Sequence, residues 1–582
     1  MNTCRLEDLP VELFHYLFSY FSTNEIFSTF TNLTSYIDSI LASYTNYRVN
    51  FKAISRSHFD LVCERIIPEH VIALTLSDDE DTPGLIGLFL SRFQIHQFTR
   101  LQALQMIEIG PDFWKIIVTQ MMRLKHLRSF RYYLSNRDYQ WMCNVPSSEV
   151  TALDKSLFDK YVLLLPQLFE LRLNHGDYLH SIQFPHLRHL ALEHSNINLI
   201  KYVASAAPQL QILETKFSFL TSFTDLILPM PRLNRLVLRI QGKNFNQQNI
   251  SHIFKFLGLS ISMNALEQMM FNLPRLRHLD LVSDCTNDVT DGQRWETIAK
   301  NLLTFIFSFT LDVYIESERQ LDSFRTSFWL DEKRWFVAYM DGRLFSVSMS
   351  KPISIEASYY YELSQYTTFP DTRIFYQHIH ELVLRKSSNY SNAHFPNVHT
   401  LTLHNPPPFL TIRNVVNLGQ IRNMTLSRLR RNFPIKSLIN KMPNLCHLSM
   451  TCDIENFLKQ FHGQVLERIR TLTIDESNNV IYIDKDDIEN MFTVFPRLEH
   501  LHVDYLCSIE EISDFLHGFK YLSVASFYYV RRYSYEDKQQ HRANIQSRLD
   551  QIRREEGLDF TYRFDSSRIC IWFKLQENDR RI

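Results

Sequence analysis

A short phrase of alternating apolar and polar residues recurs along the chain. Its form is L-x-x-L-x-L, and in eight copies a proline opens it, at Pro166, Pro185, Pro208, Pro231, Pro274, Pro396, Pro443 and Pro496. The alternation that ends each phrase predicts a short β-strand with one buried face. Apolar residues at helical spacing lie between phrases, as in Ile197, Ile200, Val203 and Ala204 before Pro208. A strand and a helix about every 20 to 30 residues predict an α/β chain of stacked repeats.

Two segments interrupt this pattern. Residues 286–370 contain Asp341-Gly342 between two alternating runs, which is a strong signal for a β-hairpin with a type I′ turn. The tail from residue 529 places Ile545, Leu549 and Ile552 at helical spacing before Gly557. The FTYRFDSSRICIWF stretch that follows predicts strand, turn and strand. We expect the first segment to be a β-rich insertion and the second to cover the last repeat.

Three short helices are predicted before the first phrase. Pro10 suits a first helical turn, and eight of the twelve residues from Pro10 to Phe21 are large and apolar. Ser22 and Glu25 form a capping-box pattern that starts a second helix. Ile37, Ile40 and Leu41 indicate a third. So small a module cannot bury every apolar side chain, so we expect one face to pack internally and one to stay available.

These patterns divide the chain into five predicted parts. They are the N-terminal helices at 1–45, a first repeat segment at 46–285, the β-rich insertion at 286–370, a second repeat segment at 371–528, and a C-terminal cap of helix and hairpin at 529–582.

Composition narrows the classes of partner. Lys and Arg total 62 and Asp and Glu total 63, a balance that does not favour nucleic acid or an anionic membrane as partner. The eight cysteines include no CxxC pair, which favours reduced thiols over a disulfide frame or a zinc site. We see no signal peptide and no apolar run of about 20 residues. We therefore expect a soluble protein of the cytoplasm or the nucleus.

Polar residues recur inside the repeated phrase. The face that carries them is predicted to be exposed, and its non-adjacent histidines, with no carboxylate at constant spacing, favour a protein-binding surface over a metal site. No nucleotide-binding or hydrolase motif is present, so we predict no enzyme activity, no metal and no cofactor. The candidate target-binding residues are His126, Glu170, Arg172, His189, Arg235, His278, His447, His500 and His502.

The repeats and the N-terminal helices resemble two known families. The L-x-x-L-x-L phrases resemble leucine-rich repeats, although the Asn usual after the phrase is mostly missing, so we expect an irregular curved solenoid. LEDLPVELFHYLFSYFSTNEIFSTFTNL, at 6–33, resembles an F-box. That resemblance implies docking on the Skp adaptor of a cullin–RING ubiquitin ligase. The implied adaptor contacts are Leu9, Pro10, Glu12, Leu13, Leu17, Phe18 and Ile26.

The combined resemblance implies a substrate-recognition subunit of an SCF-type E3 ubiquitin ligase. The adaptor and cullin would bind through the F-box, and an unidentified protein substrate would bind the solenoid. Ubiquitin transfer would be performed by other subunits, with this chain acting by proximity. Two alternatives stay open. The chain could be a non-degradative scaffold or ligand-binding protein of leucine-rich repeats, and the N-terminal helices could simply cap the solenoid.

Overall fold

The computed structural model divides into two compact units. One contains Met1–Arg172 with Pro496–Ile582, and the other contains Leu173–Phe495. Each is described by itself. The structure describes residues 6–133, 165–176, 179–180, 182–217, 229–240, 260–312, 315, 317–340, 342–347, 353–356, 365–385, 394–429, 433–451, 454–475, 485–506, 509–528, 535–555, 557–564 and 568–574.

The first unit begins its sheet with parallel strands in chain order. They are β1 (Tyr47–Asn50), β2 (Val71–Ser77), β3 (Ala103–Ile107), β4 (Ser129–Tyr133) and β5 (Glu170–His175), in which the division between the units falls. Buried apolar residues lie in one register across β2 to β5. Leu74 pairs with Leu104, Leu104 with Phe130, and Phe130 with Leu171. The connections contain α4 (Arg56–Arg65), α5 (Leu85–Arg92) and α6 (Pro111–Met121).

The second unit contains two series of parallel strands. The first is β6 (His189–Ser195), β7 (Ile212–Phe217), β8 (Arg235–Ile240), β9 (His278–Cys285) and β10 (Thr304–Leu311). The second is β13 (Ile353–Glu356), β15 (Ile379–Arg385), β16 (Thr400–His404), β17 (Asn423–Ser427), β18 (His447–Thr451) and β19 (Thr471–Asp475). The repeated phrases of this unit that the structure describes thus form strands, as predicted.

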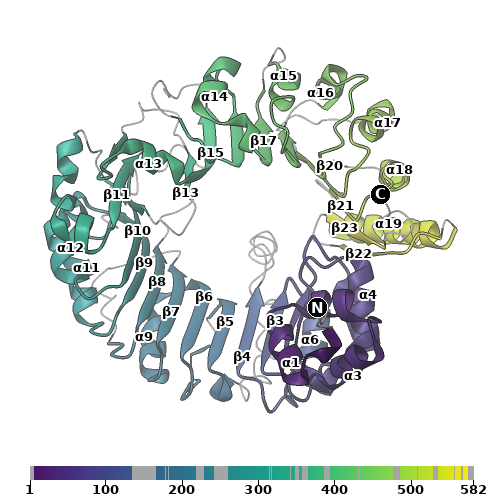
Figure 1. Ribbon diagram of the computed structural model, residues 1–582, viewed down its shortest axis with the longest axis horizontal. Helices are drawn as coiled ribbons and strands as arrows, with labels where there is room; N and C mark the ends of the chain where they lie inside the picture. Colours follow the sequence, from purple (N-terminus) through teal and green to yellow (C-terminus); the bar gives the residue numbers. More distant parts are fainter. Residues whose placement is uncertain are drawn as a thin grey trace, which may run out of the picture. The chain divides into compact units, whose positions relative to one another are not determined.

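Helices cover one face of each series (Figure 1). The first series carries α9 (Ile197–Ala206), α11 (Met263–Phe271) and α12 (Gly292–Ala299). The second carries α13 (Thr372–Gln377), α14 (Phe409–Val415), α15 (Ile435–Ile439), α16 (Ile454–Gln460) and α17 (Lys485–Val494). Short helical turns complete the connections at Leu6–Asp8, Pro68–His70, Ile95–Gln97, Leu165–Gln167, Asn287–Thr290, Glu318–Phe324, Phe328–Glu332 and Leu418–Gln420.

The buried face of α9 differs in part from the one predicted. Ile200 and Val203 are buried as expected, but Leu199 and Ala206 complete the face in place of Ile197 and Ala204. Asn196 caps the helix by accepting a hydrogen bond from the backbone N–H of Leu199 at 2.9 Å. This cap fixes where the helix begins and therefore which side meets the sheet.

The predicted β-rich insertion begins later than residue 286. All eight residues of β10 pair in parallel with β9, so the parallel series continues through Leu311. The antiparallel part then consists of β11 (Phe336–Met340), β12 (Arg343–Val347) and β14 (Gln365–Thr367). Gly342 has a φ of +75° between β11 and β12, as the hairpin prediction requires. Asp341 lies outside the described residues.

The C-terminal elements complete the first unit. They are β20 (His500–Leu506), α18 (Ile509–Gly518), β21 (Val524–Tyr528), α19 (Tyr535–Glu555), β22 (Phe560–Phe564) and β23 (Arg568–Phe573). Strands β22 and β23 form an antiparallel hairpin, and β23 pairs antiparallel with β21. The hairpin therefore covers the last parallel strand of its unit, as predicted. It also contacts the loops that follow β2 and β3, where the Arg563 side chain donates to the carbonyl oxygens of Asp78 and Glu108.

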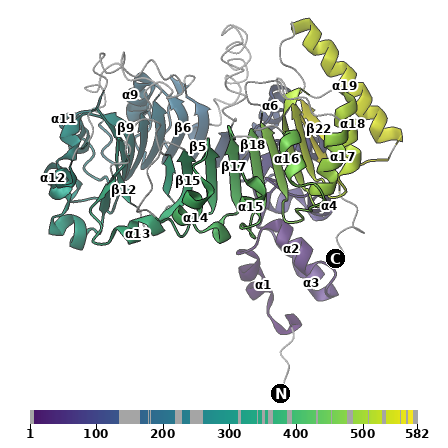
Figure 2. The same ribbon diagram turned by 90° about the horizontal axis from the view of Figure 1, so that it is seen from above.

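Three helices precede β1, namely α1 (Val11–Phe18), α2 (Thr23–Phe30) and α3 (Ser35–Ser43). They project from one edge of the strands of their own unit (Figure 2). Helix α2 packs against α4 and β1, which attaches the module to the first repeat. Among the described residues, no helix combines the length and apolarity needed to cross a bilayer.

Candidate functional site: an exposed apolar surface and the open faces of the strands

Exposed apolar side chains are concentrated in the N-terminal segment that contains α1 to α3. In the part of the chain that the structure describes, thirteen large apolar side chains are strongly exposed, and six of them lie between residues 6 and 33. Elsewhere such residues are scattered along the sequence, which is ordinary for a folded chain. We name these six the N-terminal apolar surface: Leu6, Leu13, Tyr16, Tyr20, Phe21 and Leu33.

Internal packing orients α1 so that these side chains face outward. Phe14 and Phe18 are buried, and Phe18 lies edge-on to Phe30 of α2 with ring centroids 5.3 Å apart. The Tyr36 hydroxyl of α3 donates to the Leu9 carbonyl oxygen at 3.0 Å, which fixes the start of α1. Phe14 and Phe18 occupy the inner side, and Leu13 and Tyr16 on the other side of the helix are exposed.

The capping box predicted for α2 is confirmed. The Ser22 backbone N–H donates to Glu25 Oε2 at 2.8 Å, and the Glu25 N–H donates to Ser22 Oγ at 3.3 Å. These hydrogen bonds lower the pKa of the Glu25 carboxyl, with the Ser22 backbone as the main cause. The cap fixes the short turn between α1 and α2, and with it the position of Phe21.

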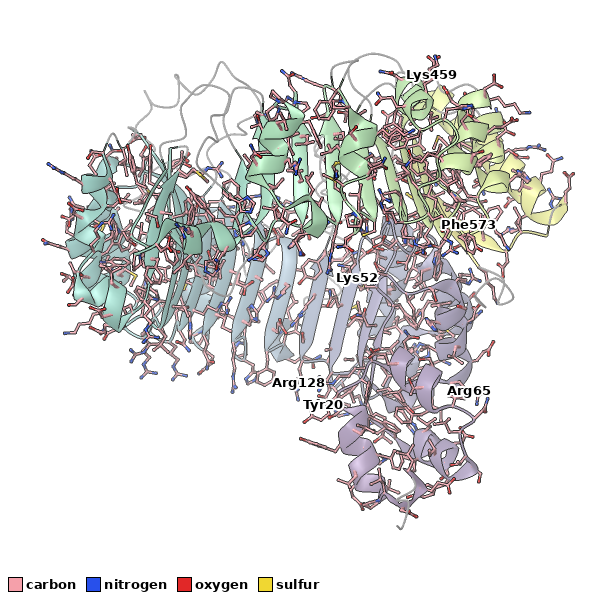
Figure 3. All side chains as sticks on the ribbon, turned by 45° about the horizontal axis from the view of Figure 1, so that its top comes forward. Tyr20, Lys52, Arg65, Arg128, Lys459 and Phe573 are labelled. Carbon is pink, nitrogen blue, oxygen red and sulfur yellow. The ribbon has the colours of Figure 1, made fainter. Side chains whose placement is uncertain are left out.

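Tyr16 and Tyr20 are exposed at the C-terminal end of α1. With Leu13 they recur at intervals of three and four residues, with Leu13 and Tyr16 in the helix and Tyr20 in the turn that follows it. The two rings lie edge-on with centroids 5.1 Å apart, and their hydroxyl groups are hydrogen-bonded to each other. Figure 3 shows Tyr20 at the outer surface of the module. Amphipathic tyrosine rings of this kind are common in protein interfaces.

The seven predicted adaptor contacts fall into three classes. Pro10, Glu12 and Leu13 are exposed, and Leu9 and Leu17 are half-buried. Phe18 and Ile26 are each only 1% exposed. Phe18 and Ile26 therefore pack inside the module. The prediction that they contact a partner directly is wrong. Tyr16 and Tyr20 were not among the predicted contacts, although the place of Tyr16 opposite Phe14 and Phe18 on α1 could have identified it.

Each series of strands has one face covered by helices (Figure 1). The other face consists of the strand side chains that alternate with the buried leucines, and we call it the open face. Strand register confirms that several predicted residues share it. His189, Arg235 and His278 occupy equivalent positions on β6, β8 and β9, with Ile212 between the first two on β7. His447 pairs with Asn423 and Thr471 in the same way. These positions lie in register across neighbouring strands.

The register overturns the placement of His126. Ser129, not His126, pairs with Glu170 on the neighbouring strand, so the strand starts three residues later than the phrase RLKHL suggested. His126 lies in the exposed turn before β4. The cause is that Leu124 and Leu127 are both buried ahead of the strand, and Phe130 takes the position that a leucine holds in other phrases.

Some charged groups on the open face are paired with one another. Glu170 forms two ion pairs. Its Oε1 lies 2.8 Å from a guanidinium nitrogen of Arg131 and 3.3 Å from Nε of Arg172. His189 Nε2 lies 3.5 Å from Glu214 Oε1. In the first unit, His500 pairs in register with Val524, and His502 Nδ1 lies 2.8 Å from Ser526 Oγ.

Hydroxyl groups dominate the open face of β16 to β19. The face includes the His404 ring, whose Nδ1 lies 2.6 Å from Ser427 Oγ, and the Asn423 amide, which donates to Thr400 Oγ1 at 3.1 Å. In contrast, the open face of β6 to β9 carries several charged side chains. The hydroxyl-bearing residues are Thr400, Thr402, Thr425, Ser427, Ser449, Thr451, Thr471 and Thr473.

Neither face offers an arrangement that would hold a metal. Within the described ranges, no group of three or more His, Cys, Asp or Glu side chains is close enough to bind one. Comparison with known proteins adds no family assignment. No family model matches the sequence, and no curated protein matches it significantly.

Proposed function

We propose that this chain is the substrate-recognition subunit of an SCF-type cullin–RING ubiquitin ligase. In this proposal α1 to α3 are an F-box that binds the Skp adaptor, and the parallel strands and helices are an irregular leucine-rich-repeat solenoid that binds a protein target. Ubiquitin transfer belongs to the other subunits, and this chain contributes proximity rather than catalysis.

One observation carries the proposal. Six exposed apolar side chains lie within residues 6–33, on α1 and on the turns next to α1 and α2, in a segment that precedes a long series of parallel strands. Concentrated apolar surface of this kind marks a protein-interaction site when it occurs on a folded chain. If α1 to α3 were only a cap, their outward side would instead be expected to be polar, as terminal caps of repeat arrays are.

A pull-down tests the adaptor contact. The full chain, tagged at its C-terminus, should recover the adaptor and the cullin from cells. The double variant Leu13→Asp with Tyr16→Asp should lose this recovery, because both side chains are exposed and truncating a central interface residue commonly costs about 2 kcal/mol or more, roughly a 30-fold loss of affinity.

A matched control separates docking from general surface damage. Leu303 and Leu410 are 65% and 66% exposed, so Leu303→Asp with Leu410→Asp makes the same kind of change outside α1 to α3. This control should recover the adaptor like the wild type, and both variants should keep the circular dichroism spectrum of the wild type. If the wild-type chain recovers neither adaptor nor cullin, the ligase proposal fails and the non-degradative scaffold replaces it.

A further inference from the structure

Two basic side chains of the second unit face each other on neighbouring strands. Lys216 on β7 pairs in register with Arg239 on β8, and both alternate with buried residues, so both lie on the open face. Neighbouring strands are about 4.8 Å apart. Like charges on directly paired residues of neighbouring strands repel, which costs stability unless something compensates. Arg235 lies on the same face of β8, four residues before Arg239.

These three cations differ from three other basic groups of the open faces. Arg131 and Arg172 are paired with Glu170, and His189 with Glu214. Across the described ranges, the side chains of Lys216, Arg235 and Arg239 make no ion pair or hydrogen bond with another residue, and Arg235 and Arg239 are exposed. Their positive charge is therefore directed to solvent.

Neighbouring carboxylates limit the size of this basic patch. Glu214 and Asp280 flank Val237, midway between Arg235 and Arg239 on the same face. Glu193 lies on β6 beside His194. Burial lowers the pKa of His194, and the positive charge of Lys216 lowers it further, against the opposing effect of Glu193. The positive charge of Lys216 on β7 therefore acts on His194 of the neighbouring strand β6, despite the nearby carboxylates.

We propose that Lys216, Arg235 and Arg239 bind an acidic peptide segment of a partner protein, with side-chain carboxylates of that segment placed between Lys216 and Arg239. A carboxylate there would relieve the repulsion and gain charge-assisted hydrogen bonds. A nucleic acid fits less well, because phosphate backbones require a long basic track, and here the cations alternate with Glu214 and Asp280. This site would be part of the surface that binds the target protein. It rests on the proposed function only because we take the partner to be that target.

Fluorescence anisotropy on the full chain tests this site. The probe is a rhodamine-labelled twelve-residue peptide with Asp or Glu at every second position, compared with the same peptide carrying Asn and Gln. The acidic peptide should bind and the amide peptide should not, and binding should weaken as salt is raised. Lys216→Gln with Arg239→Gln should weaken binding about tenfold or more.

The matched control removes the same charge elsewhere in the unit. Lys436 and Lys441 are exposed beside and within α15, and Lys436→Gln with Lys441→Gln should leave the affinity unchanged. Equal weakening in both double variants would show a non-specific charge effect and overturn the proposal. Tighter binding of a twelve-nucleotide single-stranded RNA, lost in the Lys216 and Arg239 variant, would overturn it in favour of nucleic acid. Adaptor recovery should be unchanged in both variants, so failure here is distinct from failure of the ligase proposal.

Discussion

At the scale of single residues, burial sets the chemistry of the cysteines. Cys63, Cys285 and Cys570 are buried and Cys446 is half-buried, and all four are free thiols. Burial raises the pKa of Cys63 to about 12 and raises that of Cys285 well above its usual range. The sequence analysis anticipated unpaired thiols from their spacing, but it could not rank their exposure, because that depends on the three-dimensional packing around each one.

Alkylation should follow this ranking. At pH 8 a thiol with a pKa of about 12 is ionised in roughly one molecule in 10⁴, and the thiolate is the reactive form. Brief treatment of the native chain with iodoacetamide, followed by peptide mass spectrometry, should therefore modify Cys446 and leave Cys63 and Cys285 intact. Alkylation in urea, where all three are accessible, is the control. Native labelling of Cys63 at the rate of Cys446 would contradict the described packing.

At the scale of elements, local signals predicted more than long-range ones. The capping box of Ser22 and Glu25 and the hairpin glycine Gly342 are satisfied within a few residues of themselves, so sequence was sufficient. The start of β4 was misplaced, because apolar residues at Leu124 and Leu127 fit either the strand or the turn before it, and only pairing with β5 decides between them. In the same way, pairing with β9 extends the parallel series through β10.

A glycine shows how closely two distant elements approach. Gly84 has a φ of +78°, and a Cβ there would lie 3.0 Å from Thr561 Cβ and 3.1 Å from the Tyr562 carbonyl oxygen in β22. Gly84→Ala should therefore cost about 1 to 2 kcal/mol of backbone strain and also displace the hairpin. We expect faster amide hydrogen exchange in β22 and β23.

Gly463 supplies the matched control for this prediction. Its φ of +71° is similar, but a Cβ there would have nothing within 4 Å. Gly463→Ala should carry the backbone strain alone and leave exchange in the hairpin unchanged. Equal exchange in the hairpin of Gly84→Ala and wild type would show that the close approach to β22 does not constrain this residue.

At the scale of the whole molecule, the first unit is built from both ends of the chain. Phe59 of α4 packs against Trp572 of β23 with ring centroids 5.9 Å apart, and Asp60 lies 2.9 Å from Lys574 Nζ. Arg568 lies 3.3 Å from Glu80. The sequence analysis assigned the hairpin only to its neighbouring repeat, because periodicity carries no information about contacts between segments so far apart in the chain.

Arg563 should be the most sensitive point of this contact. Its side chain is 12% exposed and donates to the Glu108 carbonyl oxygen at 3.1 Å, with a Glu108 carboxylate oxygen at 3.3 Å. Arg563→Ala should leave these acceptors unsatisfied at a cost of about 2 kcal/mol, seen as roughly 30-fold faster hydrogen exchange in the loops after β2 and β3. Arg553→Ala breaks a surface ion pair with Asp550 and should be nearly silent. Unchanged exchange in Arg563→Ala would contradict the contact.

The contact between the C-terminal hairpin and these loops also sets an order of events during synthesis. Asp78 and Glu108 leave the ribosome more than 450 residues before Arg563, a delay on the order of tens of seconds at usual elongation rates. Throughout that interval the loops after β2 and β3 lack their contacts with the hairpin, whereas the second unit, continuous from Leu173 to Phe495, has all its strands earlier. A nascent chain is therefore expected to need protection of its first-made part until its last-made part arrives. A premature stop before β22 should leave the beginning of the protein, rather than its middle, open to chaperones and proteases.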